Sequence, residues 1–359
     1  MNYKKIVAGL LALTFAFGGA ALPNTVVNSS VVASASSYDT YGDFIYTKLE
    51  NGTVEILRYR GSDEMVKIPS KINGVVVTRI NDGTFCGFEC LKNVVLPDTV
   101  TSIGSAAFQS CYNLEKIEIP DSVTSIGQAA FIGCFNLESV TLSKNLSTIE
   151  TATFVDCKSL ESITLPDSVK ELGDGVFVRC ESLTDIKLSK NLESIGKEVF
   201  KNCSNLKSVT IPSSVTEIGE NAFSSYDSET EKFIPINDLV VKCYKDSAAH
   251  KYVLKSGNRF KVIDANGSKT KYPVLIKQEY NAIYRQFRVT WTEVEGAEEY
   301  GIAVKLAGKW RIQARTNKTT FTSPKLSSGQ SYQLLICAKV NGKWDTSNIT
   351  KMAFNVIIQ

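Results

Sequence analysis

Histidine is almost absent from this chain of 359 residues, which contains only His250. Because histidine is the most frequent general base in enzymes, its scarcity argues against the common serine and cysteine hydrolase arrangements. The motifs H-E-x-x-H and G-x-S-x-G and a phosphate-binding glycine loop are also missing. Asp and Glu show no distinguished pair for glycoside hydrolysis. The sequence therefore predicts a protein that is not an enzyme and has no cofactor, with His250 partly exposed in a capping helix.

An excess of charge of one sign is missing as well. The chain has 40 Lys and Arg residues and 37 Asp and Glu residues, which gives a formal net charge of +3. Charges of both signs alternate along the chain, whereas a nucleic-acid-binding protein concentrates basic residues on one face or arm. The composition therefore predicts no nucleic-acid partner.

Long apolar runs are missing beyond the N-terminus, so we expect no membrane span once that segment is removed. Lys4 and Lys5 precede an apolar run over residues 6–22, and residues 33–35 have the small-x-small pattern of a cleavage site. These features predict a signal peptide at residues 1–35, with an uncleaved membrane anchor as the alternative. A sortase motif is missing from residues 354–359. The expected location is therefore secreted and extracellular, with non-covalent association with the cell surface as a further option.

Repetition is what the sequence has in abundance. Phenylalanine recurs every 23 residues, at Phe85, Phe108, Phe131, Phe154, Phe177, Phe200 and Phe223. Around each Phe the chain approximates A-F-x-x-C-x-x-L-x-x-I-x-I-P-x-x-V-x-x-I-G-x-x. A fixed period of this length indicates a solenoid of stacked coils.

Each repeat predicts one strand, one turn and one short helical turn. Ile117 and Ile119 alternate with polar residues, which is typical of a strand, and the spacings of three and four from Phe108 to Leu114 favour a helical turn. Gly127 is expected to supply a positive φ. About eight apolar side chains at roughly 2 kcal/mol each cannot offset the backbone entropy of one repeat, so neighbouring coils must cover both faces.

The open ends of such an array require caps. Residues 36–80 predict a β-rich N-terminal cap, and residues 81–264 contain the array with a C-terminal cap. The register breaks after Phe223, where a polar insertion at residues 224–231 is followed by a strand and a closing helix at residues 247–256.

These repeats resemble the BspA-type leucine-rich repeats of bacteria over about residues 42–264. The resemblance implies an α+β leucine-rich-repeat solenoid of 23-residue repeats with a parallel β-sheet on its concave face. It also implies a role in adhesion or protein binding on or outside the bacterial cell. Ser143 and Ser189 replace the proline at the strand end, and Asn81 and Glu150 replace the glycine.

Cysteine occupies one position of five successive repeats, at Cys111, Cys134, Cys157, Cys180 and Cys203. Stacked positions about 5 Å apart lie within the range of a disulfide, and disulfides are common in exported proteins. The number of these cysteines is odd, however, and the first repeat has Phe88 here, which indicates an apolar site. We interpret the ladder as buried free thiols, with pairing or metal binding as alternatives. Cys86 and Cys90 lack a second ligand pair, so no metal site is predicted.

A polar linker is expected at residues 265–271, beyond which the 23-residue period disappears. Residues 272–359 show short alternating strands and turn signals such as Asn341-Gly342, which predict an all-β sandwich. Trp291, the segment 295–300, and the six-residue spacing from Leu326 to Tyr332 resemble a fibronectin type III module. The resemblance implies a spacer or binding module of an exported bacterial protein.

Side chains between the buried positions of the repeat strands are expected to point outward from the sheet. We interpret them as a protein-binding face with two columns: Lys116, Glu118, Ser139, Thr141, Ser162, Thr164, Asp185, Lys187, Ser208 and Thr210. Their lack of aromatic rings favours a protein over a carbohydrate, so the expected partner is an extracellular protein on a host or neighbouring-cell surface. The alternative is that these residues serve β-propensity and solubility alone.

Two tryptophans repeat the phrase Gly-Lys-Trp, at Trp310 and Trp344. An exposed tryptophan stacks on sugars or anchors a protein interface, so binding of polysaccharide or cell-wall carbohydrate by the C-terminal domain is the alternative function. Cross-strand packing at a sandwich edge is the structural alternative for both residues. A surface spacer without a ligand is the third hypothesis.

Overall fold

The computed structural model describes residues 38–263, 270, 272–345 and 353–358. The expected signal peptide at residues 1–35 lies outside the described residues, as does all of the expected linker except Thr270. The described part of the chain contains many short strands and one α-helix, α2 (Ala248–Ser256). None of its helices is long and apolar enough to cross a membrane.

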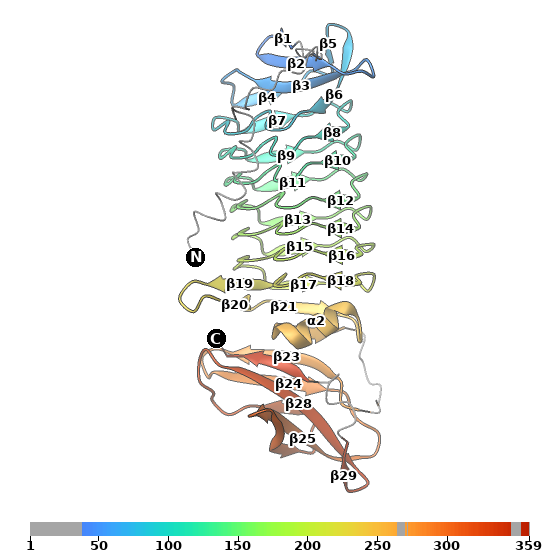
Figure 1. Cartoon of the computed structure of the whole chain (residues 1–359), viewed down its shortest axis with the longest axis vertical. Coiled ribbons are helices and arrows are strands. Elements are labelled where there is room, and N and C mark those ends of the chain that lie inside the picture. Colours follow the sequence, from blue (N-terminus) through green and yellow to red (C-terminus); the bar gives the residue numbers. More distant parts are fainter. Residues whose placement is uncertain (1–37, 264–269, 271, 346–352, 359) are drawn as a thin grey trace, which may run out of the picture. The chain divides into compact units, whose positions relative to one another are not determined.

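Coils of the repeat array stack in register and build a parallel-strand β-solenoid (Figure 1). Each coil contributes a three-residue strand, and these strands are β7 (Asn93–Val95), β9 (Lys116–Glu118), β11 (Ser139–Thr141), β13 (Ser162–Thr164), β15 (Asp185–Lys187) and β17 (Ser208–Thr210). A second, two-residue strand follows in each coil, and these are β8 (Ser102–Ile103), β10 (Ser125–Ile126), β12 (Thr148–Ile149), β14 (Glu171–Leu172), β16 (Ser194–Ile195) and β18 (Glu217–Ile218). Ser139 pairs with Lys116, one full repeat earlier.

The prediction of a helical turn after each two-residue strand is wrong, so the helical part of the α+β assignment is wrong for the repeats. The segment around Phe108 is a run of tight turns. Cys111 N–H donates back to the Phe108 carbonyl at 3.2 Å, but Phe108 N–H donates to the Ala130 carbonyl of the next coil at 2.8 Å. Because alternate N–H groups bond to the neighbouring coil, the i to i−4 bonds of an α-helix do not form.

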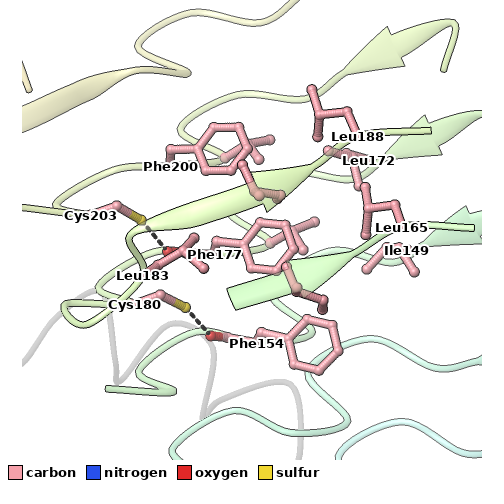
Figure 2. Packing of buried hydrophobic residues seen from close by; sticks show 14 of the residues in the cluster. Ile149, Phe154, Leu165, Leu172, Phe177, Cys180, Leu183, Leu188, Phe200 and Cys203 are labelled. Atoms are coloured by element: carbon pink, nitrogen blue, oxygen red, sulfur yellow. Dashed lines mark hydrogen bonds between the residues drawn. The ribbon is translucent and has the colours of Figure 1, made fainter. Parts of the chain in front are cut away.

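The phenylalanines form one continuous column through the core, as the period predicts. Successive rings from Phe85 to Phe223 are stacked with centroids 5.1–5.7 Å apart and ring planes within 12° of parallel. Figure 2 shows Phe154, Phe177 and Phe200 in this arrangement. All of these rings are buried. Each ring therefore packs on the equivalent ring of the neighbouring coil.

The cysteine ladder is buried beside the ring column, and its five thiols are free, as predicted. Each thiol donates to the carbonyl of the Phe 26 residues earlier, as Cys180 does to Phe154 at 3.1 Å and Cys203 to Phe177 at 3.0 Å (Figure 2). Burial raises the pKa of Cys111 and of Cys203 to about 12 and that of the three thiols between them well above the usual value. The ladder therefore packs as neutral, apolar side chains.

Glycine at the end of each repeat has a different role from the predicted one. The φ of Gly127 does not lie in the left-handed region; instead, a Cβ on Gly127 would lie 2.4 Å from the Ser105 nitrogen of the previous coil. Positive φ occurs two residues before and two residues after the core phenylalanines, for example at Ala106 (φ 53°) and Ser110 (φ 57°). The glycine is therefore needed for close approach of two coils, and the left-handed positions lie elsewhere.

A β-rich segment covers the first coil. Its strands are β1 (Asp39–Tyr41), β2 (Phe44–Lys48), β3 (Val54–Tyr59), β4 (Met65–Lys67), β5 (Lys71–Ile72) and β6 (Val75–Ile80). The hairpins β1–β2 and β2–β3 are antiparallel, whereas β3 pairs in parallel with β6 and starts the solenoid register.

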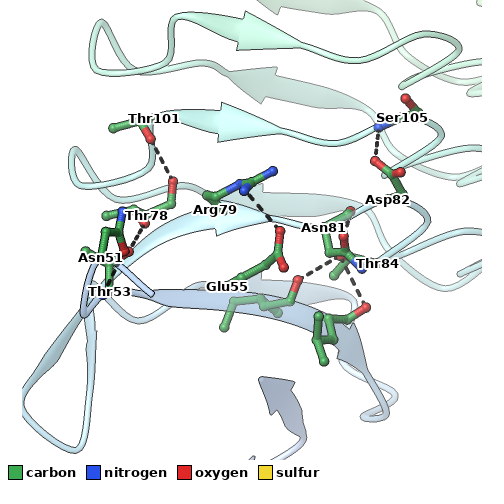
Figure 3. A network of polar contacts seen from close by, with 12 residues as sticks. Asn51, Thr53, Glu55, Thr78, Arg79, Asn81, Asp82, Thr84, Thr101 and Ser105 are labelled. Carbon is green, nitrogen blue, oxygen red and sulfur yellow. Dashed lines mark hydrogen bonds and ion pairs between the residues drawn. The ribbon is translucent and has the colours of Figure 1, made fainter. Parts of the chain in front are cut away.

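Polar side chains tie this segment to the coils that follow (Figure 3). The hydroxyls of Thr53 and Thr78 lie 2.7 Å apart, and Thr101 donates to the Thr78 carbonyl at 3.1 Å. Buried Thr84 donates to the Ile56 carbonyl at 3.1 Å. The Ile56 and Thr78 carbonyls also accept the backbone N–H groups of Asn81 and Thr101, so these side-chain bonds add to the backbone pairing between the coils.

The opposite end of the array is closed by a hairpin, two further strands and the helix. Strands β19 (Ser224–Asp227) and β20 (Lys232–Pro235) form an antiparallel hairpin, and β21 (Val240–Cys243) and β22 (Arg259–Val262) extend the parallel ladder. Ser247 caps the start of α2, and Gly257 ends it in the left-handed conformation (φ 77°).

His250 is buried in this helix, 2% exposed, and the expected partly exposed position is wrong. Its Nε2 lies 2.9 Å from the Leu275 carbonyl, and its Nδ1 accepts from the Asp246 N–H at 3.1 Å. The ring therefore acts as a fully bonded packing element between the helix and β23. The position of His250 in the helix sequence did not indicate this burial, because the ring is covered by β23, which begins 25 residues later in the chain.

The C-terminal region contains two antiparallel sheets with a shared core. One includes β23 (Leu275–Asn281), β24 (Gln286–Trp291) and β27 (Thr320–Thr322), and β23 also pairs with β22. The other includes β26 (Lys309–Thr316), β25 (Ala297–Leu306), β28 (Ser331–Val340), β29 (Lys343–Trp344) and β30 (Phe354–Ile357). Trp291 and Tyr300 meet edge to face in the core, 5.5 Å apart.

Candidate protein-binding surface

The ten predicted binding residues lie on the face formed by the three-residue strands, which we call the strand face. Within β9, β13 and β15 the central residue is buried and its two neighbours are exposed. Ser208 is half-buried, because Lys242 of β21 donates to its hydroxyl at 3.3 Å. The outward positions follow the alternation in the sequence, as expected, whereas their role in binding stays a prediction.

Direct pairing groups these residues into three sets. Lys116 and Glu118 pair with Ser139 and Thr141, and Ser162 and Thr164 pair with Asp185 and Lys187. Ser208 and Thr210 pair with Val240 and Lys242. The strand face therefore presents hydroxyls flanked by charges of both signs, which suits a partner recognised through hydrogen bonds and ion pairs.

Two apolar side chains are exposed at the N-terminal end of the strand face, and sequence reasoning missed one of them, Met65. Met65 is 65% exposed and Val95 is 44% exposed, on the paired strands β4 and β7. Val95 follows from the repeat register, but Met65 lies before the regular repeats. Its position one coil before Asn93 was therefore not visible in the sequence.

Exposed ion pairs also join successive coils, at positions outside the three-residue strands. Lys144 Nζ lies 3.1 Å from Asp121, and Lys170 Nζ lies 2.9 Å from Glu193. Hydrogen bonds from the Lys144 backbone and side chain hold the pKa of Asp121 below its usual value. Opposite charges one repeat apart are thus paired here. Because these pairs are exposed, each adds little to the free energy of unfolding.

Exposed aromatic rings occur at the solenoid edge where the chain enters the three-residue strands. Tyr112 and Phe135 are 36% and 38% exposed and stack with centroids 5.0 Å apart. Tyr226, 39% exposed, contacts Phe233 across the hairpin β19–β20 at 5.3 Å. Sequence reasoning missed these residues, although Tyr112 and Phe135 share one repeat position, four residues after a core phenylalanine.

Trp310 and Trp344 lie on the same sheet of the C-terminal region, and each is half-buried. A Cβ on Gly301 would lie 3.0 Å from the Trp344 ring, and the Arg315 guanidinium lies 5.7 Å from its centroid. Trp344 therefore packs across its own sheet, and part of each ring remains accessible to solvent.

Clusters of metal-binding side chains are missing from the described residues, where no three His, Cys, Asp or Glu side chains are placed to hold an ion. Cys86 and Cys90 are exposed, and the other cysteines are buried.

Comparison with known proteins agrees with the repeat geometry. The family model of the BspA type leucine-rich repeat region matches residues 64–182 and 124–248, with six copies. No curated protein matches the chain.

Solved structures that are similar to the chain come from several bacteria. A leucine-rich cell surface protein from Faecalibacterium prausnitzii is 25% identical, with a TM-score of 0.49, over 58% of this chain and 70% of that protein. A leucine-rich repeat protein of T. pallidum is 30% identical, with a TM-score of 0.48, over 52% of this chain and 88% of that protein. From the family match and the stacked 23-residue coils we conclude that the chain belongs to the BspA-type leucine-rich repeat family.

Proposed function

We propose that this protein is an exported, non-enzymatic interaction protein that binds a protein on a host or neighbouring-cell surface through the strand face. The observation that carries the proposal is the register of the coils. It places side chains that are 23 residues apart in adjacent outward positions, while the buried residues between them hold the fold. Outward residues can therefore vary with the partner without loss of the core.

Export and surface location are supported by two observations. The N-terminal segment has the charge, apolar run and cleavage pattern of a secretion signal. A similar solved structure, from Faecalibacterium prausnitzii, is described as a cell surface protein.

The C-terminal region acts in this proposal as a fibronectin type III-like spacer or secondary binding module. The order of its strands supports the assignment, because β23, β24 and β27 share one sheet and β26, β25, β28 and β30 share the other. In the constant immunoglobulin arrangement the fourth strand lies beside the fifth, whereas here β26 lies beside β25. Leu326 and Tyr332 both pack against the core.

Replacement of Lys116, Glu118, Asp185 and Lys187 by Ala tests the strand face. A partner is first captured with the full-length exported protein from its native surroundings, and its affinity is then measured for each variant. We expect the quadruple variant to bind at least about tenfold more weakly, because it loses charged groups from two of the paired sets.

A matched control replaces Asp121, Lys144, Lys170 and Glu193 by Ala. It also removes two acidic and two basic exposed residues, but from the ion pairs away from the strand face. Equal affinity of the two variants would show that the strand face does not bind the partner.

Carbohydrate binding by the C-terminal region is the second candidate, favoured by the partly accessible rings of Trp310 and Trp344 on one sheet. A glycan array with the full chain, alongside its Trp310→Ala and Trp344→Ala variants, tests it. Binding to a glucan, xylan or peptidoglycan that depends on either ring supports the idea, and no binding to any of them rejects it.

A further inference from the structure

A second surface follows the solenoid edge where the chain enters the three-residue strands, and we call it the aromatic edge. One column of it contains the residues four positions after the core phenylalanines from Phe85 to Phe200: Glu89, Tyr112, Phe135, Lys158, Glu181 and Ser204. All of these side chains are exposed. Because the column includes acidic, basic and hydroxyl residues, the fold does not require rings at this position, so the Tyr112–Phe135 stack needs another explanation.

The hairpin β19–β20 adds a second aromatic pair to this edge. It interrupts the repeat directly after Phe223, and Figure 1 shows it projecting from the side of the solenoid on which the chain enters β17. Tyr226 N–H donates to Asn202 Oδ1 of the preceding coil at 2.9 Å, which fixes the base of the hairpin. Lys201 Nζ lies 5.7 Å from the Tyr226 ring and 5.0 Å from the Phe233 ring.

The two aromatic pairs are separated by a distance that suits one protein interface. Phe135 and Tyr226 belong to coils that are four repeats apart, and the ring column gives a spacing of 5.4–5.7 Å per repeat along this stretch. The separation is therefore about 20 Å, comparable with the width of an interface that buries about 800 Å² per partner. Exposed Tyr and Phe are the residue types enriched in such interfaces.

Carboxylates beside the aromatic edge indicate the charge of the partner. Glu115, Glu138 and Glu161 are exposed and occupy one position in three successive coils, seven residues after the core phenylalanine. Glu138 N–H donates to the Glu115 carbonyl at 2.9 Å, so two of these residues are direct neighbours. Like charges in adjacent strands are destabilising, whereas the same solenoid pairs opposite charges elsewhere.

Lysines beside the aromatic stack and its carboxylates are already engaged, as Lys92 is with Glu64 at 2.8 Å. Lys158 Nζ lies 5.6 Å from the Phe135 ring centroid and 3.6 Å from Glu181. The surface around Tyr112 and Phe135 therefore combines apolar rings with a negative rim, which complements a partner that is both cationic and apolar.

We propose that the aromatic edge docks a basic protein segment in which arginine or lysine side chains lie next to apolar ones. The inference rests on the proposed role in protein binding, but it assigns a surface other than the strand face and gives the chemistry of the partner. Apolar side chains of the segment cover the Tyr112 and Phe135 rings, and its cations meet Glu115 and Glu138.

Fluorescent 12-residue peptides probe the full-length protein. One repeats Arg-Leu-Ser, one repeats Arg-Ser-Ser and one repeats Glu-Leu-Ser. We expect the Arg-Leu-Ser peptide to bind at least about tenfold more tightly than the other two, because it alone matches both the rings and the carboxylates. The double variant Tyr112→Ser with Phe135→Ser should lose that advantage. Serine is native at this position in Ser204, so the variant retains the fold.

The control variant is Tyr284→Ser, which removes an exposed tyrosine (60% exposed) that is not part of the aromatic edge and should leave peptide binding unchanged. Binding that is insensitive to the two rings, no binding of any peptide at 1 mM, or self-association of the chain that the double variant abolishes would each overturn the proposal. The strand-face quadruple variant should still bind the peptide, so failure of the strand-face proposal is distinguished from failure of this one.

Discussion

At the scale of single residues, the cysteines show how burial changes chemistry. Cysteines at stacked positions favour disulfide formation when a protein is in an oxidising environment. Here each ladder thiol is buried and donates to a Phe carbonyl, for example Cys111 to Phe85 at 3.1 Å. Because the thiolate is the reactive form, a raised pKa together with burial makes these thiols inert.

The raised thiol pKa values predict a loss of stability at high pH. Thiols of the unfolded chain ionise near pH 8.5, whereas burial holds the pKa of Cys111 and Cys203 at about 12 in the folded state. The unfolded state therefore releases protons first, so the free energy of unfolding is unaffected below about pH 8.5 and falls as the pH rises towards 12. Urea unfolding at a series of pH values measures this effect.

Cys203→Ala is the control for this alkaline effect. The variant loses packing at every pH, but it should show a shallower decline of the free energy of unfolding between pH 9 and pH 11. Parallel profiles for the variant and the wild type would contradict the assignment of the decline to the buried thiols.

At the scale of the single coil, contacts with the neighbouring coil determine the backbone. The glycine at the end of the repeat faces the backbone of the previous coil, and Gly219 repeats the geometry of Gly127, with a Cβ position 2.4 Å from the Lys197 nitrogen. Where Ser143 replaces the proline, its hydroxyl is buried and donates to the Val123 carbonyl of the previous coil at 2.6 Å. Nothing in the structure explains how Glu150 is tolerated at the glycine position.

Gly127→Ala is expected to destabilise the solenoid by about 1–3 kcal/mol, because the added methyl group overlaps backbone atoms that cannot move independently of their coil. The free energy of unfolding in urea provides the measurement. Gln128→Ala, at the exposed neighbouring position, should change the stability by less than about 0.5 kcal/mol. Equal stability of both variants would show that the coils separate easily at this point.

At the scale of the whole molecule, the solenoid is a one-dimensional array with apolar ends that must be covered. The phenylalanine column is closed by aromatic side chains from outside the regular repeats. Tyr59 of β3 lies 5.7 Å from Phe85, and Tyr252 of α2 meets Phe223 edge to face at 5.6 Å. Buried Asn258 also donates to the Phe223 carbonyl at 2.8 Å. The caps therefore continue both the apolar and the hydrogen-bonded parts of the stack.

Removal of one cap contact should loosen the array from that end. Tyr252→Ala uncovers Phe223, and we expect a loss of about 2–4 kcal/mol. Hydrogen exchange should rise first in β17 and β18 and least in β9 and β10, because each coil contacts only its neighbours. Tyr252→Phe keeps the ring and should behave like the wild type. A uniform rise of exchange through all coils would mean that the array unfolds as one unit.

The sequence by itself determined the features that depend on a fixed period. A phenylalanine every 23 residues requires equal coils, and equal coils place the rings, the thiols and the outward strand residues in columns. Alternation within the strands then identifies which side chains are exposed, because successive side chains of a strand point to opposite faces.

Only the tertiary structure decided the features that depend on which atoms of another coil or domain lie opposite. This group includes the run of tight turns in place of a helical turn, the close approach at Gly127, the burial of His250 against the Leu275 carbonyl and the exposure of the Tyr112–Phe135 stack. In each case the free energy comes from contacts between residues distant in the sequence. A local pattern contains the spacing of the side chains along the chain, but not the identity of the atoms that face them.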